Sequence, residues 1–281
     1  MKTLYNYCTK LHRYCFNKND GLDIYMGQYE KAIALWQKRN IRNDADLAEA
    51  LSSQSVLFAY NSGKIENDSI TYHDTREIFE HDGVTSYTGD LRTLFEIRNA
   101  KNANELLLQA FNERWPLSEE LIKRFHYCLT ENTYDTRRWQ LGERPGEYKK
   151  HDFVTGPQEI GASAEDVQEE MIELLDDLQT PIPDNKAIVA AAFFHAKFEN
   201  IHPFADGNGR TGRILMNYIL LLHNHPPITI HEEDRETYYK ALDAWHDNTD
   251  LKPLVSFLKE QTEKTWDKQI QRDENKQERH G

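Results

Sequence analysis

The stretch that decides the fold is Ile201–Arg213, IHPFADGNGRTGR, and an apolar run over residues 214–222 follows it without a break. The stretch combines an imidazole, a carboxylate, a carboxamide, glycines and two guanidinium groups. The apolar run predicts a buried helix. We therefore expect a loop that turns directly into a helix N-terminus.

Such a loop suits a polyphosphate ligand. The first turn of a helix has backbone N–H groups without partners and carries the positive end of the helix dipole. Gly207 and Gly209 allow the backbone to approach an anion closely. Arg210 and Arg213 are three residues apart, so they project from neighbouring positions of the first turn. Both can hold phosphate oxygens with paired N–H donors.

Two further residues of the loop supply reactive groups. Asp206 is a hard oxygen ligand of the kind that Mg²⁺ takes when phosphates complete its coordination. His202 stands just before the turn, and its ordinary pKa of about 6.5 makes a neutral base available at cellular pH. The loop thus predicts a site for phosphate chemistry with an acid–base group.

At every specified position the stretch matches the signature His-Pro-Phe-x-Asp-Gly-Asn-Gly-Arg-x-x-Arg, and in this it resembles the Fic family. Fic proteins are mostly nucleotidyltransferases that move AMP from ATP to a protein hydroxyl. The resemblance implies an all-α helical bundle with a small β-hairpin flap over the active site. It implies His202 as the catalytic base and Asp206 as the Mg²⁺ ligand. The residues that it implies for phosphate binding are Gly207, Asn208, Gly209, Arg210 and Arg213.

A second informative stretch lies far upstream, at residues 60–67, YNSGKIEN. Taken alone, a polar turn with one Glu is typical of a solvated surface. Beside the signature, Ser62, Glu66 and Asn67 match the inhibitory motif of the family, which is Ser or Thr, three residues, Glu, and then Gly or Asn. The resemblance implies that Glu66 pairs with Arg213. That pairing would misplace the phosphates of ATP, and a misplacement of about 1 Å can cost about 10²-fold in rate.

Residues 131–162 break the helical pattern because glycine and proline punctuate them. Residues 148–155, YKKHDFVT, have local strand character and predict a β-hairpin, although a surface loop is equally compatible with this pattern. In the family a hairpin here is the flap, which pairs with the target backbone by strand addition. The candidate flap residues are Phe153, Val154 and Thr155. Lys149 stands where the family usually has Arg. Lys has no guanidinium fork and cannot make the paired contacts of an Arg, which weakens any role carried over from that Arg.

The rest of the chain reads as helices. We expect them at about residues 3–16, 23–39, 44–60, 90–115 and 118–129, then on both sides of the signature, and from about 252 to 266. Tyr239 lies in an amphipathic pattern after the signature, and the resemblance makes it a residue that lines the nucleotide pocket. His126 and His195 are expected to pack or hydrogen-bond in the core.

Four segments follow from this pattern. They are an N-terminal helical region (1–54), helices carrying the inhibitory motif (55–115), the Fic core (116–260) and a charged C-terminal tail (261–281), of which residues 267–281 are expected to fray.

Composition limits the class of protein. The chain has 281 residues, 38% of them hydrophobic and 29% charged, and a formal net charge of −13. This charge argues against a general nucleic-acid binder, which would be basic. The apolar runs are too short to span a bilayer. Three cysteines without metal-ligand spacing fit a reducing compartment, and the first residues lack the apolar core of a signal peptide, so a cytoplasmic protein is expected.

The sequence therefore predicts a protein adenylyltransferase that is restrained by Glu66. Its expected partners are ATP, with Mg²⁺ as cofactor, and a protein carrying an acceptor hydroxyl; self-modification and a homo-oligomer stay open, and neither nucleic acid nor membrane is expected. The alternatives are removal of AMP, use of another nucleotide, or a catalytically silent peptide-binding module.

Overall fold

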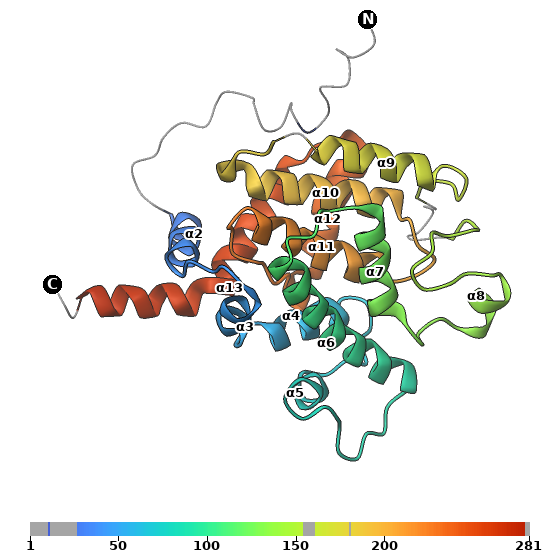
Figure 1. Cartoon of the computed structure of the whole chain (residues 1–281), viewed down its shortest axis with the longest axis horizontal. Coiled ribbons are helices and arrows are strands. Elements are labelled where there is room, and N and C mark those ends of the chain that lie inside the picture. Colours follow the sequence, from blue (N-terminus) through green and yellow to red (C-terminus); the bar gives the residue numbers. More distant parts are fainter. Residues whose placement is uncertain (1–10, 12–26, 154–160, 180, 279–281) are drawn as a thin grey trace, which may run out of the picture.

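Helices make up the regular structure of this computed structural model, which describes residue 11 and residues 27–153, 161–179 and 181–278 (Figure 1). The α-helices in chain order are α2 (Gln28–Lys38), α3 (Asp44–Leu51), α4 (Ser55–Lys64), α5 (Tyr72–His81), α6 (Leu91–Asn112), α7 (Glu119–Thr130), α8 (Thr136–Gln140), α9 (Val167–Leu178), α10 (Ala187–Ile201), α11 (Asn208–Leu222), α12 (Arg235–Asn248) and α13 (Lys252–Glu278). Short 3-10 turns precede α10 and α12. The expected helical bundle is confirmed.

Two apolar helices, α10 and α11, form the centre of the bundle (Figure 1). Both are buried on nearly all sides, which is the environment that a helix without a polar face requires. Helices α7 and α9 pack beside them, while α6 crosses in front and contacts α7 and α11. The signature loop joins the end of α10 to the start of α11, so two rigid central helices hold it in place.

Local signals predict several helix ends. Ser118 caps α7, where its Oγ accepts a hydrogen bond from Leu121 N–H, and Thr71 caps α5 in the same way through Asp74 N–H. Side-chain oxygens at these positions satisfy backbone donors that have no partner within the helix. The expected helices at 90–115 and 118–129 are therefore found within a few residues of the predicted ends.

One predicted helix is wrong. The segment expected as a single helix over residues 44–60 is two helices, α3 and α4, with a turn at residues 52–54. Ser52 and Ser55 donate their hydroxyls to the carbonyls of Glu49 and Leu51. Serine side chains that bond to nearby carbonyls compete with the helical hydrogen bonds, which explains the break.

The C-terminal segment also differs from expectation, because α13 continues to Glu278 instead of fraying after Trp266. Trp266 and Ile270 are buried, and the Trp266 ring meets Trp36 of α2 edge-on with centroids 5.2 Å apart. Lys31 Nζ lies 2.8 Å from Glu274 Oε1 across the same contact. The last turns are ordered by α2, a partner more than two hundred residues away in sequence.

The expected flap is not found as a hairpin, since no strand occurs in the described ranges. Phe153 is half-buried, whereas Val154 and Thr155 lie outside the described residues. The buried Glu143 holds the residues that precede Phe153. Its carboxylate accepts a hydrogen bond from Lys150 N–H and lies 2.9 Å from His151 Nδ1. The helix expected at residues 3–16 also falls outside the described part, apart from residue 11. No described helix has the length and apolar character needed to cross a membrane.

Candidate active site

The signature loop leaves α10 and enters α11 through two residues with positive φ. His202 has φ 51° and Gly207 has φ 79°. A side chain at position 207 would collide with Thr130 of α7, so the tight turn needs glycine there. A histidine in the left-handed region is strained, and such strain is typical of functional loops. The His202 N–H is held by the Phe198 carbonyl at 2.9 Å.

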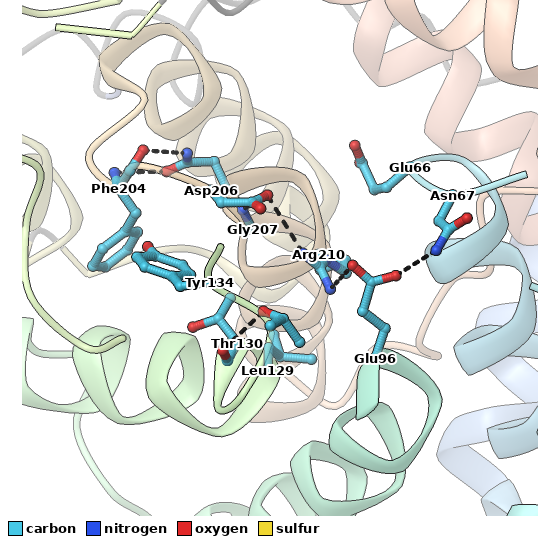
Figure 2. Close-up of polar contacts among 12 residues, drawn as sticks. Glu66, Asn67, Glu96, Leu129, Thr130, Tyr134, Phe204, Asp206, Gly207 and Arg210 are labelled. Atoms are coloured by element: carbon cyan, nitrogen blue, oxygen red, sulfur yellow. Dashed lines mark hydrogen bonds and ion pairs between the residues drawn. The ribbon is translucent and has the colours of Figure 1, made fainter. Parts of the chain in front are cut away.

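Asn208 holds the loop in shape. Its Oδ1 accepts from Phe204 N–H at 2.9 Å and its Nδ2 donates to the Phe204 carbonyl at 2.8 Å, and both bonds are visible at Phe204 in Figure 2. The residue is 2% exposed. These two bonds hold the side chain against the Phe204 backbone, and the backbone N–H of Asn208, at the start of α11, is in a position to meet a phosphate.

His126 of α7 hydrogen-bonds to the backbone of the signature loop and packs against it. Its Nδ1 accepts from Gly146 N–H at 2.9 Å, and its Nε2 lies 2.8 Å from the Asp206 carbonyl. A backbone N–H can only donate and a carbonyl can only accept, so Nε2 carries the hydrogen. Burial lowers the pKa of His126 to about 3, which agrees with a neutral ring. The ring stacks on Phe204 with centroids 3.6 Å apart.

We expect His126→Ala to lower the free energy of unfolding by about 3 kcal/mol, since it removes a buried ring and leaves two backbone groups without a partner. Urea unfolding followed by circular dichroism measures the change. The matched control is His81→Ala, at an exposed histidine that ends α5, which should change stability by less than about 0.5 kcal/mol. Equal stabilities of the two variants would contradict the supporting role of His126.

The two reactive groups of the loop have opposite electrostatic surroundings. Burial, together with the nearby Lys149 ammonium, lowers the pKa of His202 to about 4. His202 is therefore neutral at pH 7. Burial would raise the pKa of Asp206, but the guanidinium groups of Arg210, Arg92 and Arg138 together hold it below its ordinary value. Asp206 is therefore a carboxylate.

Arg213 is buried, 2% exposed, and bound to the upstream segment. Its Nε donates to Ser62 Oγ at 3.0 Å, and its Nη2 donates to the Ser62 carbonyl and to Glu66 Oε1, both at 2.8 Å. Although burial lowers the pKa of Arg213, Glu66 and other neighbours raise it above its ordinary value. A side chain at Gly209 would collide with Glu66, so glycine leaves the room that this carboxylate occupies.

Arg210 points to a different pair of acids. Its Nη1 lies 3.4 Å from Glu96 Oε1 and its Nη2 lies 3.5 Å from Asp206 Oδ1. Figure 2 shows Arg210 between these two carboxylates, with Glu96 turned also toward Asn67. The two signature arginines are thus both buried, and each is held by acidic residues.

Comparisons with known proteins identify the family to which the signature region belongs. A family model described as Fic/DOC family matches residues 116–220. The chain carries a Fic/DOC family domain. Among curated relatives, "Protein adenylyltransferase Fic" of Nematostella vectensis is 29% identical over 226 residues, covering 79% of this chain and 50% of the relative. The protein of the same name from Aedes aegypti is 44% identical over 230 residues, covering 79% of this chain and 43% of the relative.

Solved structures show the same fold. A Fic domain containing signaling protein from Bacteroides thetaiotaomicron has a TM-score of 0.72 and 25% identity, covering 87% of this chain and 96% of that chain. Fic-1 from C. elegans has a TM-score of 0.69 at 24% identity, covering 90% and 73% of the two chains. The chain spans about half the length of the curated relatives it matches.

Segments outside the matched Fic region complete the site. Ser62 and Glu66 reach Arg213 from α4 and the turn after it, and Asn67 reaches Glu96 at 2.7 Å. Tyr239, on α12, is 41% exposed. Burial, together with the nearby Glu66 carboxylate, raises the pKa of Tyr239 to about 12. The structure thus brings most of the predicted residues to one place, apart from the flap residues outside the described ranges.

Sequence reasoning missed four residues of the site. Glu96 and Arg92 have only a weak signal, an Arg and a Glu four residues apart on a predicted helix. Lys149 is buried beside His202, although lysine usually marks a surface. Glu199 lies near Arg213, its Oε1 is buried with no hydrogen-bond partner in the described part of the chain, and desolvation raises its pKa to about 8. Its acidic character within an apolar helix was the available signal.

Proposed function

We propose that this chain is a protein adenylyltransferase that moves AMP from ATP to a Ser, Thr or Tyr hydroxyl of a protein. The observation that carries the proposal is the neutral His202 on the same short loop as the ionised Asp206, directly before the N-terminus of α11. The names of the curated relatives support AMP transfer over other uses of such a loop.

The chemistry assigned to the loop is a displacement at the α-phosphorus. His202 accepts the proton of the target hydroxyl while the hydroxyl oxygen bonds to the α-phosphorus. The bond between the α-phosphorus and the oxygen that bridges it to the β-phosphorus breaks. Pyrophosphate leaves with the electron pair of that bond. General-base assistance of this kind is worth about 10²–10⁴ in rate.

Backbone and guanidinium donors hold the phosphates in this proposal. Gly207, Gly209 and the backbone of Asn208 surround the N-terminus of α11, where an anion is favoured. Arg210 and Arg213 bind the β- and γ-phosphates, which requires each to exchange an acidic partner for phosphate oxygens. Tyr239 lines the nucleotide pocket.

Asp206 fits a Mg²⁺ ligand. Its carboxylate is ionised and half-buried, and no cluster of three or more His, Cys, Asp or Glu side chains suited to a metal occurs in the described part of the chain. A cation at Asp206 would thus depend on phosphates for most other ligands, as Mg²⁺ often does. Bound there, Mg²⁺ would supply positive charge to the phosphates.

Glu66 restrains the reaction in this proposal, with Ser62 and Asn67 fixing the segment that carries it. The target protein docks at the flap region, with Phe153, Val154 and Thr155 as contact residues. The matched Fic region lies inside the proposed core of residues 116–260, and residues 55–115 supply the restraint. Self-modification and self-association belong to the same proposal.

The position of a radioactive label tests the proposal. A Glu66→Gly variant is incubated with ATP labelled at the α- or the γ-phosphate, with and without cell lysate. AMP transfer labels protein from the α-position only. Label from the γ-position would identify phosphorylation, and no label from either would favour another nucleotide or a silent binding role. Loss of label on adding wild-type chain would identify AMP removal.

A further inference from the structure

We propose that Arg92, in the first turn of α6, is a latch on Asp206 that competes with the divalent cation for this carboxylate. The inference rests on the proposed function and adds a second restraint to that of Glu66. Arg92 Nη2 donates to Asp206 Oδ2 at 2.7 Å, and Arg92 Nε donates to Glu96 Oε1 at 3.1 Å. One guanidinium thus joins α6 to the signature loop.

Each oxygen of Asp206 has its own partners. Oδ1 accepts from Gly207 N–H at 2.7 Å and lies 3.5 Å from Arg210 Nη2. Gly207 and Arg210 belong to the loop and to α11, so their contacts with Asp206 do not depend on the position of α6. Oδ2 has Arg92, whose side chain is 39% exposed. Arg92 is therefore the partner that can leave toward solvent when a cation takes Oδ2.

Glu96 ties the latch to the inhibitory segment. Its side chain is 5% exposed, and it collects Arg92, Arg210 and Asn67 around one carboxylate. Asn67 Nδ2 donates to Glu96 Oε2 at 2.7 Å and to Thr93 Oγ1 at 3.0 Å. Figure 2 shows Glu96 between Asn67 and Arg210.

The adjacent residues Glu66 and Asn67 therefore act on both restraints, the one on Arg213 and the one on Asp206. Glu66 holds Arg213, and Asn67 holds Glu96, which in turn holds Arg92 on Asp206. A movement of the Glu66–Asn67 segment would disturb the phosphate restraint and the cation restraint together. Loss of Arg92 alone would remove only the second.

Nucleotide binding tests the latch without relying on turnover. In a Glu66→Gly parent, the Kd of a fluorescent, non-hydrolysable ATP analogue is measured by anisotropy in saturating Mg²⁺ and again in EDTA. The Arg92→Ala variant lacks the partly exposed ion pair that competes with Mg²⁺ for Asp206. The ratio of its Kd in EDTA to its Kd in Mg²⁺ should therefore be about fivefold higher than that of the parent. Arg92→Lys, which keeps the charge, should stay closer to the parent.

Arg98→Ala is the matched control. Arg98 lies on the same helix and also pairs with an aspartate, at 3.5 Å, but that aspartate is Asp82, which follows α5 and is not part of the signature loop. Its ratio should equal that of the parent. An unchanged ratio in Arg92→Ala would overturn the latch, and equally weakened binding in both buffers would identify Arg92 as a phosphate ligand instead. A parent that binds no analogue at all would overturn the proposed function and the latch with it.

Discussion

Replacing Glu66 with glycine is expected to raise the rate of AMP transfer from ATP by about 10²-fold, the cost of a misaligned phosphate. Glu66 occupies Arg213 Nη2 at 2.8 Å and places negative charge where a phosphate would bind. The ion pair is expected to stabilise the protein little, because the Arg213 charge loses hydration on burial while the Glu66 side chain stays 34% exposed. The two hydrogen bonds from Arg213 to Ser62 do not involve Glu66, so we expect them to remain in the variant.

Initial rates of label incorporation from α-labelled ATP measure this effect. Asp68→Gly is the matched control, because Asp68 lies two residues further along, is exposed, and its carboxylate makes a surface pair with Arg235. Its rate should stay within about twofold of wild type, as expected for a surface ion pair. Glu66→Gln keeps the size of the side chain and removes its charge, so it should also be faster than wild type. A Glu66→Gly variant as slow as wild type would show that this ion pair does not limit the reaction.

Adding His202→Ala to the Glu66→Gly variant should lower the transfer rate by about 10²–10⁴-fold, the usual contribution of a general base. Binding of the ATP analogue should persist, because the proposed phosphate contacts come from α11 and not from the imidazole. The control is His73→Ala, at an exposed histidine of α5. Loss of both binding and transfer would indicate that His202 supports the loop and is not its base.

The lowered pKa of His202 predicts how kcat/KM depends on pH. Burial lowers the pKa of His202 to about 4, so the neutral form is already dominant at pH 6. Because kcat/KM reports ionisations of the free enzyme, it should be flat from pH 6 to 8 and fall only as the pH approaches the pKa. Glu66 raises this pKa, so its removal lowers the value further and leaves the plateau intact. An inflection near pH 6.5 that disappears in the His202→Ala variant would contradict the shifted pKa.

Local sequence patterns determined a large part of this protein. The run Ile201–Arg213 and the apolar residues after it predicted a loop entering a buried helix, and the loop and α11 are found there. Ser118 and Thr71 predicted helix starts because a cap depends on residues only three positions apart. The contact of Glu66 with Arg213 was accessible through resemblance alone, since no local pattern relates residues 147 positions apart.

The tertiary structure alone decided which helices are neighbours, and that choice assigns the remaining partners. Arg92 reaches Asp206 across 114 positions because α6 packs against α11. Asn208 has its carboxamide turned to the Phe204 backbone, so the folded loop decides that the side chain does not point to a ligand. The end of α13 is helical because Trp266 and Ile270 find a buried place beside α2 and the core. Propensity and periodicity act over one or two turns, whereas burial and ion pairing depend on contacts that exist only after the helices have packed.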